Sequence, residues 1–371
     1  MRKDWEYKKL GEVCDILDSQ RKPVTKKDRK KGIYPYYGAT GIQDFVDNYI
    51  FDGRYVLVGE DGAKWSANEK CAYIIEGKTW INNHAHVLST KNMVIDSFLT
   101  YYLNFSDLDS YISGAIIRKL TQSSLKSIPI PLPPKPTQLA IVAELDKINE
   151  LIQLKKQQLK DYDQLAQSIF YEMFGDPVEN EKGWEVKKYG DLFTIGSGGT
   201  PSKAKEEYWN NGDIPWIGSN MCQNRIIYKT DGKYITKEGL NNSSAKLLMP
   251  GTILVALVGA TIGKVALLKT ETTTNQNIAF IKVNETKEFM PEYVYYFLMN
   301  QYNEFLNIGN GNFKMANLSF IKGLFITKAP LPLQQQFAAR IEAIERQKQQ
   351  VSETIKDLET LLASRMQYWF D

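Results

Sequence analysis

The feature that most constrains the fold is an internal repeat. The segment WEYKKLGEVCDI at residues 5–16 returns as WEVKKYGDLFTI at 184–195, with six of twelve residues identical at an offset of 179. Further matches follow in the same order: YPYYGA with IPWIGS, YVLVGEDG with TILVALVG, NNHAHVL with NQNIAFI, and LKSIPI with IKGLFI. The offset grows to 196, mainly through extra residues between Gly218 and Thr252, where we expect loops. A chain of 371 residues with two such copies predicts two domains of one fold.

Both copies change character near their ends. From Pro136 and Pro332 onward, segments rich in Gln, Lys, Glu, Leu and Ile replace short stretches of β-branched and aromatic residues. The two prolines suit the first turn of a helix, and Gly175 with Pro177 marks the end of the first segment. At ~1.5 Å per residue, each segment predicts a helix of about 55 Å.

Each predicted helix carries an apolar heptad stripe that requires a partner. In the first helix the stripe consists of Leu145, Ile148, Ile152, Leu159, Tyr162, Ala166, Ile169 and Met173. In the second it consists of Ile341, Ile344, Val351, Ile355, Leu358, Leu362 and Trp369. Three charged residues interrupt the stripes, namely Lys155, Lys348 and Arg365. Such residues either extend to solvent or set the pairing register. Pairing within the chain is the favoured interpretation, and a coiled coil with another chain is the alternative.

These observations predict an α+β fold. Strand-rich globular domains would occupy 1–135 and 176–331, and long helices 136–175 and 332–371. If the helices pack antiparallel as a coiled-coil stalk, the globular domains lie at its opposite ends. The chain would then have an approximate two-fold axis within a single polypeptide.

Composition favours a cytoplasmic protein. Three cysteines without paired spacing argue against a disulfide framework, and the start MRKDWEYKKL does not resemble a signal peptide. The longest uncharged run, LLMPGTILVALVGATIG, contains a proline and falls short of the ~20 residues that span a bilayer. We therefore expect no membrane segment and interpret this run as a buried strand.

No arrangement of residues typical of catalysis is found. The only histidines, His84 and His86, are expected on the same face of a predicted strand, and no cysteine lies near them, so we expect no metal site. The segment GATIGK lacks the spacing and the Ser or Thr of a phosphate-binding loop. Methyl transfer would require a glycine-rich strand-to-helix turn and an Asn or Asp followed by Pro-Pro and an aromatic, and neither pattern is present. We expect no catalytic residues and no cofactor, which favours a binding protein.

Basic segments in predicted loops suggest contacts to a phosphate backbone, although such clusters are also common on solvated surfaces. The net charge of +3 alone identifies no partner, so the clusters carry this hypothesis. The backbone-contact candidates are Arg21, Lys22, Lys26, Lys27, Arg29, Lys30, Lys31, Arg118, Lys119, Lys203, Lys205, Arg225 and Lys314.

Aromatic and amide side chains accompany these cations in both copies. Asn and Gln can read adenine through paired hydrogen bonds, and aromatic rings pack against sugars or bases. The base-contact candidates are Tyr36, Tyr37, Asn82, Asn83, His84, His86, Trp216, Ser219, Asn220, Asn275, Gln276 and Asn277. Two related but different readers suit a bipartite, asymmetric site on duplex DNA.

The chain resembles the specificity (S) subunits of type I restriction-modification systems over essentially its full length. The motifs are W-E-x-K-K at Trp5 and Trp184, SGGTPSK…EYW…GDIPWIG at 197–218, INNHAHVL at 81–88, SIFYEMFGD at 168–176 and LPLQQQFAARIEAI at 331–344. The resemblance implies two target recognition domains, each reading half of a split DNA site, joined by helices that space the half-sites. It also implies no catalytic activity in this chain itself.

The implied partners are two copies of an adenine methyltransferase subunit, which carry S-adenosylmethionine, and translocating nuclease subunits. The first domain departs from the family pattern because DSQRKPV replaces the GGTPS string, so its contact loop cannot be transferred from the second domain. The rival interpretation is an interaction scaffold in which a coiled-coil stalk carries two ligand-binding β-rich domains.

Overall fold

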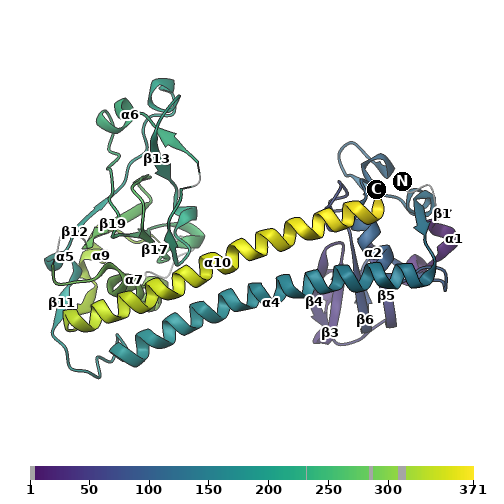
Figure 1. The fold of residues 1–371 in the computed structure, drawn as a ribbon, viewed down its shortest axis with the longest axis horizontal. Coiled ribbons are helices and arrows are strands. Elements are labelled where there is room, and N and C mark those ends of the chain that lie inside the picture. Colours follow the sequence, from purple (N-terminus) through teal and green to yellow (C-terminus); the bar gives the residue numbers. More distant parts are fainter. Residues whose placement is uncertain (1–4, 231, 284–286, 308–314) are drawn as a thin grey trace. The chain divides into compact units, whose positions relative to one another are not determined.

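The computed structural model describes residues 5–230, 232–283, 287–307 and 315–371 (Figure 1). The chain forms two compact units, Met1–Gln157 with Ser352–Asp371 and Gln158–Val351. Each unit contains one copy of the repeat. Within the described part of the chain, no helix combines the length and the apolar character needed to cross a membrane.

The described part of the first unit contains ten strands, with α1 (Leu10–Val13), α2 (Asp96–Phe105) and α3 (Gln122–Ser127) between them. The strands are β1 Glu6–Lys9, β2 Cys14–Ile16, β3 Lys31–Gly38, β4 Gly41–Val46, β5 Phe51–Gly59, β6 Ala72–Ile81, β7 Ala85–Thr90, β8 Ile112–Ser113, β9 Lys119–Leu120 and β10 Pro129–Leu132. Six of them form a sheet in the order β2-β7-β5-β6-β3-β4, in which only β3 and β6 run parallel. The pairs β1–β10 and β8–β9 are antiparallel.

The central strand β5 shows how this sheet is packed. Successive side chains of a strand point to opposite faces. Val56 and Val58 join a core with Phe98 of α2, whereas Leu57 joins a second cluster with Ile75 on the other face. Because both faces are covered, the run Val56–Val58 is fully buried and needs no polar alternation.

The second unit repeats this plan with insertions. Its helices are α5 (Tyr189–Leu192), α6 (Lys237–Asn241), α7 (Pro291–Asn300), α8 (Tyr302–Leu306) and α9 (Leu318–Gly323). Its strands are β11 Val186–Lys188, β12 Thr194–Ser197, β13 Ile214–Ile217, β14 Arg225–Ile227, β15 Tyr234–Ile235, β16 Thr252–Ala256, β17 Val265–Leu268, β18 Thr273–Thr274, β19 Ile278–Lys282 and β20 Phe325–Thr327. They form sheets in the orders β12-β19-β16-β17-β14, β15-β13-β18 and β11-β20. Every residue of β16 is buried, which confirms the buried strand predicted from the uncharged run.

Each unit has one buried glutamine at the start of a long helix. Gln138 accepts a hydrogen bond from the backbone N–H of Ile95 (2.9 Å) and donates to the carbonyls of Met93 (2.9 Å) and Pro133 (3.0 Å). Gln334 does the same with Met290, Glu288 and Ala329. Both side chains are almost fully buried, so each helix start is fastened to its own domain by three hydrogen bonds.

The two predicted long helices are present as α4 (Lys135–Phe174) and α10 (Leu331–Phe370), each 40 residues long. Gly175, with φ of +72°, follows α4 in the left-handed conformation that ends many helices. The predicted domain boundaries gave each long helix a range of its own, 136–175 and 332–371, apart from the globular domains. The compact units instead divide both helices, because each half packs with the domain core nearest to it.

The paired helix segments run antiparallel within each unit. In the first unit, Glu144 of α4 meets Arg365 of α10, and further along α4 Lys156 meets Glu359 (2.9 Å). In the second unit, Asp163 of α4 pairs with Lys348 of α10 (2.8 Å). The residues of the predicted helix-pair interface are all buried or half-buried, namely Leu145, Ile148, Ile152, Leu159, Tyr162, Ile169, Ile341, Ile344, Val351, Ile355, Leu358 and Leu362. Two of the charged residues that interrupt the stripes, Arg365 and Lys348, thus make ion pairs across the helices, which favours the prediction that they set the pairing register.

Candidate nucleic-acid interface

The basic segment at residues 21–31 of the first unit divides into inward arginines and outward lysines. Arg21 bonds Glu60 (2.5 Å) and the carbonyl of Ala85 (2.8 Å). Arg29 pairs with Asp44 (3.2 Å), and its guanidinium lies 4.2 Å from the ring centre of Tyr36. Both arginines therefore fasten the segment to the sheet. The five lysines of the segment are exposed, and they are Lys22, Lys26, Lys27, Lys30 and Lys31.

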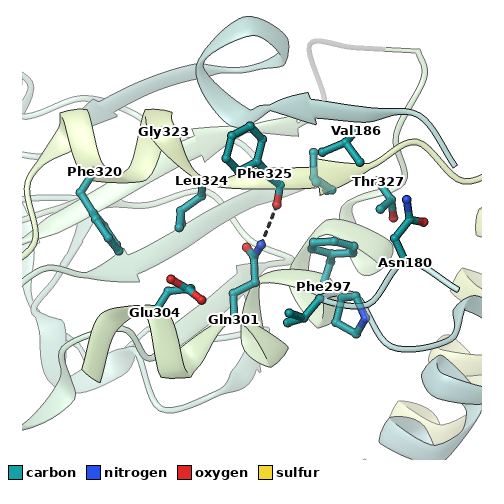
Figure 2. Close-up of a pocket in the computed structure, with 13 residues that line it drawn as sticks. Asn180, Val186, Phe297, Gln301, Glu304, Phe320, Gly323, Leu324, Phe325 and Thr327 are labelled. Atoms are coloured by element: carbon teal, nitrogen blue, oxygen red, sulfur yellow. Dashed lines mark hydrogen bonds between the residues drawn. The ribbon is translucent and has the colours of Figure 1, made fainter. Parts of the chain in front are cut away.

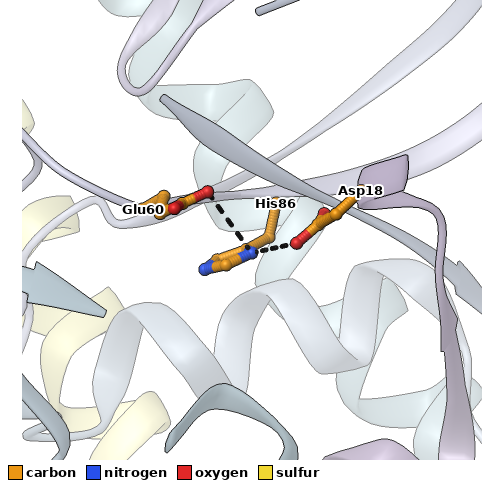
Figure 3. Close-up of side chains that lie close together, drawn as sticks. All are labelled: Asp18, Glu60 and His86. Carbon is orange, nitrogen blue, oxygen red and sulfur yellow. Dashed lines mark hydrogen bonds and ion pairs between the residues drawn. The ribbon is translucent and has the colours of Figure 1, made fainter. Parts of the chain in front are cut away.

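A buried polar network forms the base of this segment (Figure 3). His86 contacts Asp18 through Nδ1 (2.6 Å) and the carbonyl of Leu120 through Nε2 (2.8 Å). Glu60 is held between Arg21 and Lys119, the latter at 2.6 Å. Burial by itself would raise the pKa of Glu60, but the hydrogen bonds from Lys119 and Arg21 outweigh it and lower that pKa. The network joins the ends of β5, β7 and β9.

The donors of this network do not form a convincing metal site. Oxygen and nitrogen atoms of Asp18, Glu60 and His86 lie within 4.8 Å of one another. However, Arg21 pairs with both carboxylates and Lys119 pairs with Glu60, so side-chain cations already balance the carboxylate charge. We interpret the cluster as structural.

The three cysteines have no nucleophilic character. Cys14, Cys71 and Cys222 are buried free thiols, and burial raises the pKa of each to about 12. A thiolate is the reactive form of cysteine, so none of the three is poised for attack at neutral pH.

A matching turn in each unit presents an exposed amide side chain. The Asn82 side-chain oxygen accepts the backbone N–H of His84 (2.8 Å), and that of Asn275 accepts the N–H of Asn277 (3.0 Å). This local bond holds the turn, and the intervening residue points outward. That residue is Asn83 in the first unit and Gln276 in the second, and both are exposed. Asn83 and Gln276 therefore present side-chain amides at the surface, and amides are groups that can read a base.

The SGGTPSK motif of the second unit lies against this turn. The N–H of Gly199 donates to the carbonyl of Thr274 (2.8 Å), and the Thr200 hydroxyl donates to Gln276 (2.6 Å). Ser219 is half-buried, and Asn220, Lys203, Lys205 and Arg225 are exposed. Lys205 also donates to the hydroxyl of Tyr208 (2.9 Å). The DNA contacts predicted for these residues stay predictions.

Several predicted contact residues lie in the interior instead. Tyr36, Asn82, His86 and Trp216 are buried, and Trp216 donates its indole N–H to the carbonyl of Gly199 (3.1 Å). A buried side chain that is already hydrogen-bonded has no free edge for a base, so for these four the structure corrects the prediction to a supporting role.

Other predicted contact residues are paired with other side chains or lie outside the predicted element. Arg21, Arg29 and Lys119 are committed to ion pairs inside the first unit, so their main role is anchoring. Arg118 pairs with Asp109 (2.6 Å) but stays half exposed. The prediction that His84 and His86 share a strand face is wrong, because β7 begins at Ala85 and His84 lies in the turn, where it pairs with Asp61 (2.6 Å). Tyr37 and Asn277 are half-buried, and Lys314 lies outside the described residues.

One exposed feature was not predicted from the sequence. The tip of the β8–β9 hairpin carries Ile116 and Ile117, which are 97% and 71% exposed. Gly114, with φ of +93°, makes the tight turn possible, and an added Cβ there would lie 2.1 Å from the Ile117 carbonyl oxygen. Two consecutive aliphatic residues between SG and RK were the available signal.

Comparison with known proteins gives the family. Residues 2–161 and 181–360 each match the type I restriction modification DNA specificity domain. A putative type I restriction enzyme specificity subunit of Haemophilus influenzae is 32% identical over 302 residues, which cover 79% of this chain and 75% of that protein. A type I restriction enzyme specificity subunit of Escherichia coli is 30% identical over 258 residues, covering 65% of this chain and 60% of that protein.

A solved structure gives the same fold. The S subunit of a type I restriction-modification system from M. genitalium has a TM-score of 0.58 at 13% identity, covering 99% of this chain and 96% of that chain. The double match to the specificity domain accounts for the internal repeat and covers most of the chain. This chain therefore belongs to the family of type I restriction-modification specificity subunits.

Proposed function

We propose that this chain is the non-catalytic DNA-recognition subunit of a type I restriction-modification complex. Each unit reads one half of a bipartite, asymmetric duplex target. The chain binds two copies of an adenine methyltransferase subunit, which bring S-adenosylmethionine, and through them the translocating nuclease subunits. Because we expect duplex DNA as its partner, we place the chain in the cytoplasm.

The observation that carries this proposal is the duplicated turn with a diverged tip. Asn82 and Asn275 make the same hydrogen bond two residues onward, so the turn is retained in both copies. The exposed residue on that turn differs, being Asn83 in one copy and Gln276 in the other. A retained scaffold with different exposed amides supports two readers that recognise different bases.

The surrounding charge supports binding to duplex DNA. In the first unit the exposed lysines at residues 22–31 adjoin the network that ends at the turn, because Arg21 bonds the carbonyl of Ala85 directly after it. Lysines of this kind supply salt-dependent affinity for phosphates, while the amides supply selectivity.

The test is to express the chain with the methyltransferase subunit of the same system and to map methylated adenines across the host genome. We expect a split, asymmetric motif with one methylated adenine in each half. Asn83→Ala should relax the bases preferred in one half alone, and Gln276→Ala those in the other half. A single continuous motif, or changes in both halves from either substitution, would contradict the proposal.

A further inference from the structure

The hairpin β8–β9 of the first unit carries two aliphatic side chains at its tip, Ile116 and Ile117. They are 97% and 71% exposed. The hairpin is fixed at its base, because Lys119 of β9 pairs with the buried Glu60 (2.6 Å). Two adjacent aliphatic side chains held in water on a fixed support favour contact with a partner that covers them.

Backbone hydrogen bonds connect this hairpin to the turn that presents Asn83. The N–H of Leu120 donates to the carbonyl of Glu60 (2.8 Å), and the N–H of Glu60 donates to the carbonyl of His84 (2.8 Å). The hairpin therefore lies two strand spacings from the turn. At ~4.8 Å per spacing, the lateral separation is about 10 Å.

The tip and the turn also extend from the same end of the sheet. β7 begins opposite the end of β5, where Ala85 pairs with Gly59, so the turn before β7 lies beyond the end of β5. Asp61, just past β5, forms an antiparallel bridge with Lys119. The chain running back from Lys119 to Ile117 therefore continues in the direction in which β5 leaves the sheet. A partner that contacts the turn also meets the tip.

The second unit retains the same connection. The N–H of Ala316 donates to the carbonyl of Leu257 (2.9 Å), and the N–H of Leu257 donates to the carbonyl of Asn277 (2.9 Å). Val258 and Met315 form the matching antiparallel bridge. A connection that is retained beside both turns favours a common role in recognition.

The surroundings of the tip suit DNA better than protein. Lys64 and Arg118 line the hollow beside the tip, and although they pair with Glu69 and Asp109, their side chains stay 77% and 54% exposed. Such cations can contact phosphates while the tip contacts bases. Two aliphatic side chains also fall far short of the ~800 Å² that each partner buries in a standard protein interface.

The projecting shape of the tip matters as much as its apolar character. A hollow of about 540 Å³ in the second unit, between α7 and β20, is also apolar (Figure 2). Its wall residues Phe297 and Leu324 are buried, and the nearly buried Gln301 donates to the carbonyl of Phe325 (2.6 Å). A recessed surface of this kind cannot enter a groove of DNA, whereas the tip of β8–β9 can.

The major groove of duplex DNA offers a matching partner for this tip. The groove is about 12 Å wide and admits a two-stranded β-ribbon, which is what β8 and β9 form. The apolar group that base edges present in this groove is the C5-methyl of thymine. Contact between that methyl and an aliphatic side chain removes apolar surface of both from water.

We propose that Ile116 and Ile117 select thymine in the half-site of the first unit by contacting its C5-methyl in the major groove. The inference rests on the proposed function above, in which the neighbouring turn reads a base through Asn83. The tip lies about 10 Å to the side of that turn, and base pairs are stacked ~3.4 Å apart. The selected thymine therefore lies within about four base pairs of the base that Asn83 reads.

The first test replaces the two aliphatic side chains. The chain with Ile116→Ser and Ile117→Ser is expressed with the methyltransferase subunit of the same system, and methylated adenines are mapped. We expect one or two thymines of the motif to become variable, in the half that Asn83→Ala also relaxes. Ile116→Leu with Ile117→Leu should keep the thymine preference. The matched control, Val178→Ser with Val186→Ser at exposed positions of the second unit, should leave that half unchanged.

The second test removes the methyl group from the DNA instead. Fluorescence anisotropy compares binding of the methyltransferase complex to its mapped target and to the same duplex with deoxyuridine in place of the selected thymine. Wild-type binding should weaken by about 4-fold for each methyl removed. The variant with both Ser substitutions should bind the two duplexes equally, and its circular dichroism should match the wild type.

Three results would overturn the thymine contact alone: a first half-site with no thymine within reach, a thymine preference that survives both Ser substitutions, or equal wild-type binding to the two duplexes. A rise in the fluorescence of 2-aminopurine beside the selected thymine on wild-type binding, absent with the Ser variant, would also overturn it, because the tip would then insert between base pairs. A wild-type methylation map without a split motif would overturn the proposed function as well.

Discussion

Replacing four lysines of the basic segment tests the division between anchoring arginines and DNA-facing lysines. Lys26, Lys27, Lys30 and Lys31 are exposed, whereas Arg29 is held by Asp44 and Tyr36. If each lysine neutralises one phosphate, changing all four to Gln lowers the slope of log K against log salt by about 3.6, four times ~0.9. At about 0.15 M salt that slope corresponds to a loss of up to about a thousand-fold in affinity.

The assay is fluorescence anisotropy with a labelled duplex of arbitrary sequence between about 50 and about 200 mM salt. The matched control removes the same charge from exposed lysines outside the segment, at Lys126, Lys135, Lys147 and Lys160. The control should leave the slope nearly unchanged, and unfolding of both variants should resemble the wild type because no described ion pair is lost. An equal fall in slope for the control, or a loss confined to one DNA sequence, would refute the backbone-contact role of the segment.

Three further predictions concern stability. Gln138→Met should lower the free energy of unfolding of the first unit, measured with urea, by about 3 kcal/mol, because three buried hydrogen bonds are lost at about 1 kcal/mol each. The control Gln153→Met, at an exposed position of the same helix, should change that free energy by under about 0.5 kcal/mol. The pKa values of Asp18 and Glu60 are lowered in the folded state, so both carboxylates stabilise the protein fully above the ordinary carboxyl pKa range, and this stabilisation is lost as pH falls through their folded pKa values. Glu60→Gln should therefore flatten the decline of stability below about pH 5. An unchanged decline would contradict a stabilising role of the network. Gly175→Ala should cost about 1 kcal/mol because alanine is strained at φ of +72°, and an unchanged thermal midpoint would argue against a left-handed helix end.

The elements that repeat or follow a period were predictable from the sequence. The heptad stripe identified both long helices and the buried faces they would use, because periodicity depends only on local spacing. The uncharged run around β16 was identified as a buried strand because it lacks charge and is too short to span a bilayer. The cross-helix pairs of Arg365 and Lys348 were not predictable, since an interrupted stripe does not show which residue of the partner lies opposite.

The candidate interface was only partly predictable. Composition marked the basic segment correctly as a cluster, but it could not separate Arg21 and Arg29, which turn inward, from the lysines, which do not. In the same way NNHAH was interpreted as part of a strand, and the sequence could not show that Asn82 and His86 are buried while Asn83 projects from a turn. The arginines of this segment are turned inward by carboxylates elsewhere in the chain, Glu60 for Arg21 and Asp44 for Arg29.

The sequence by itself determined that the protein is built twice, that each copy ends in a long helix, and which family it belongs to, because duplication and periodicity are written in residue order. Tertiary structure decided which charged and amide groups are exposed and which are buried or paired. Those properties depend on burial and on partners distant in the chain, since a side chain is available for recognition only when the folded protein does not already satisfy it.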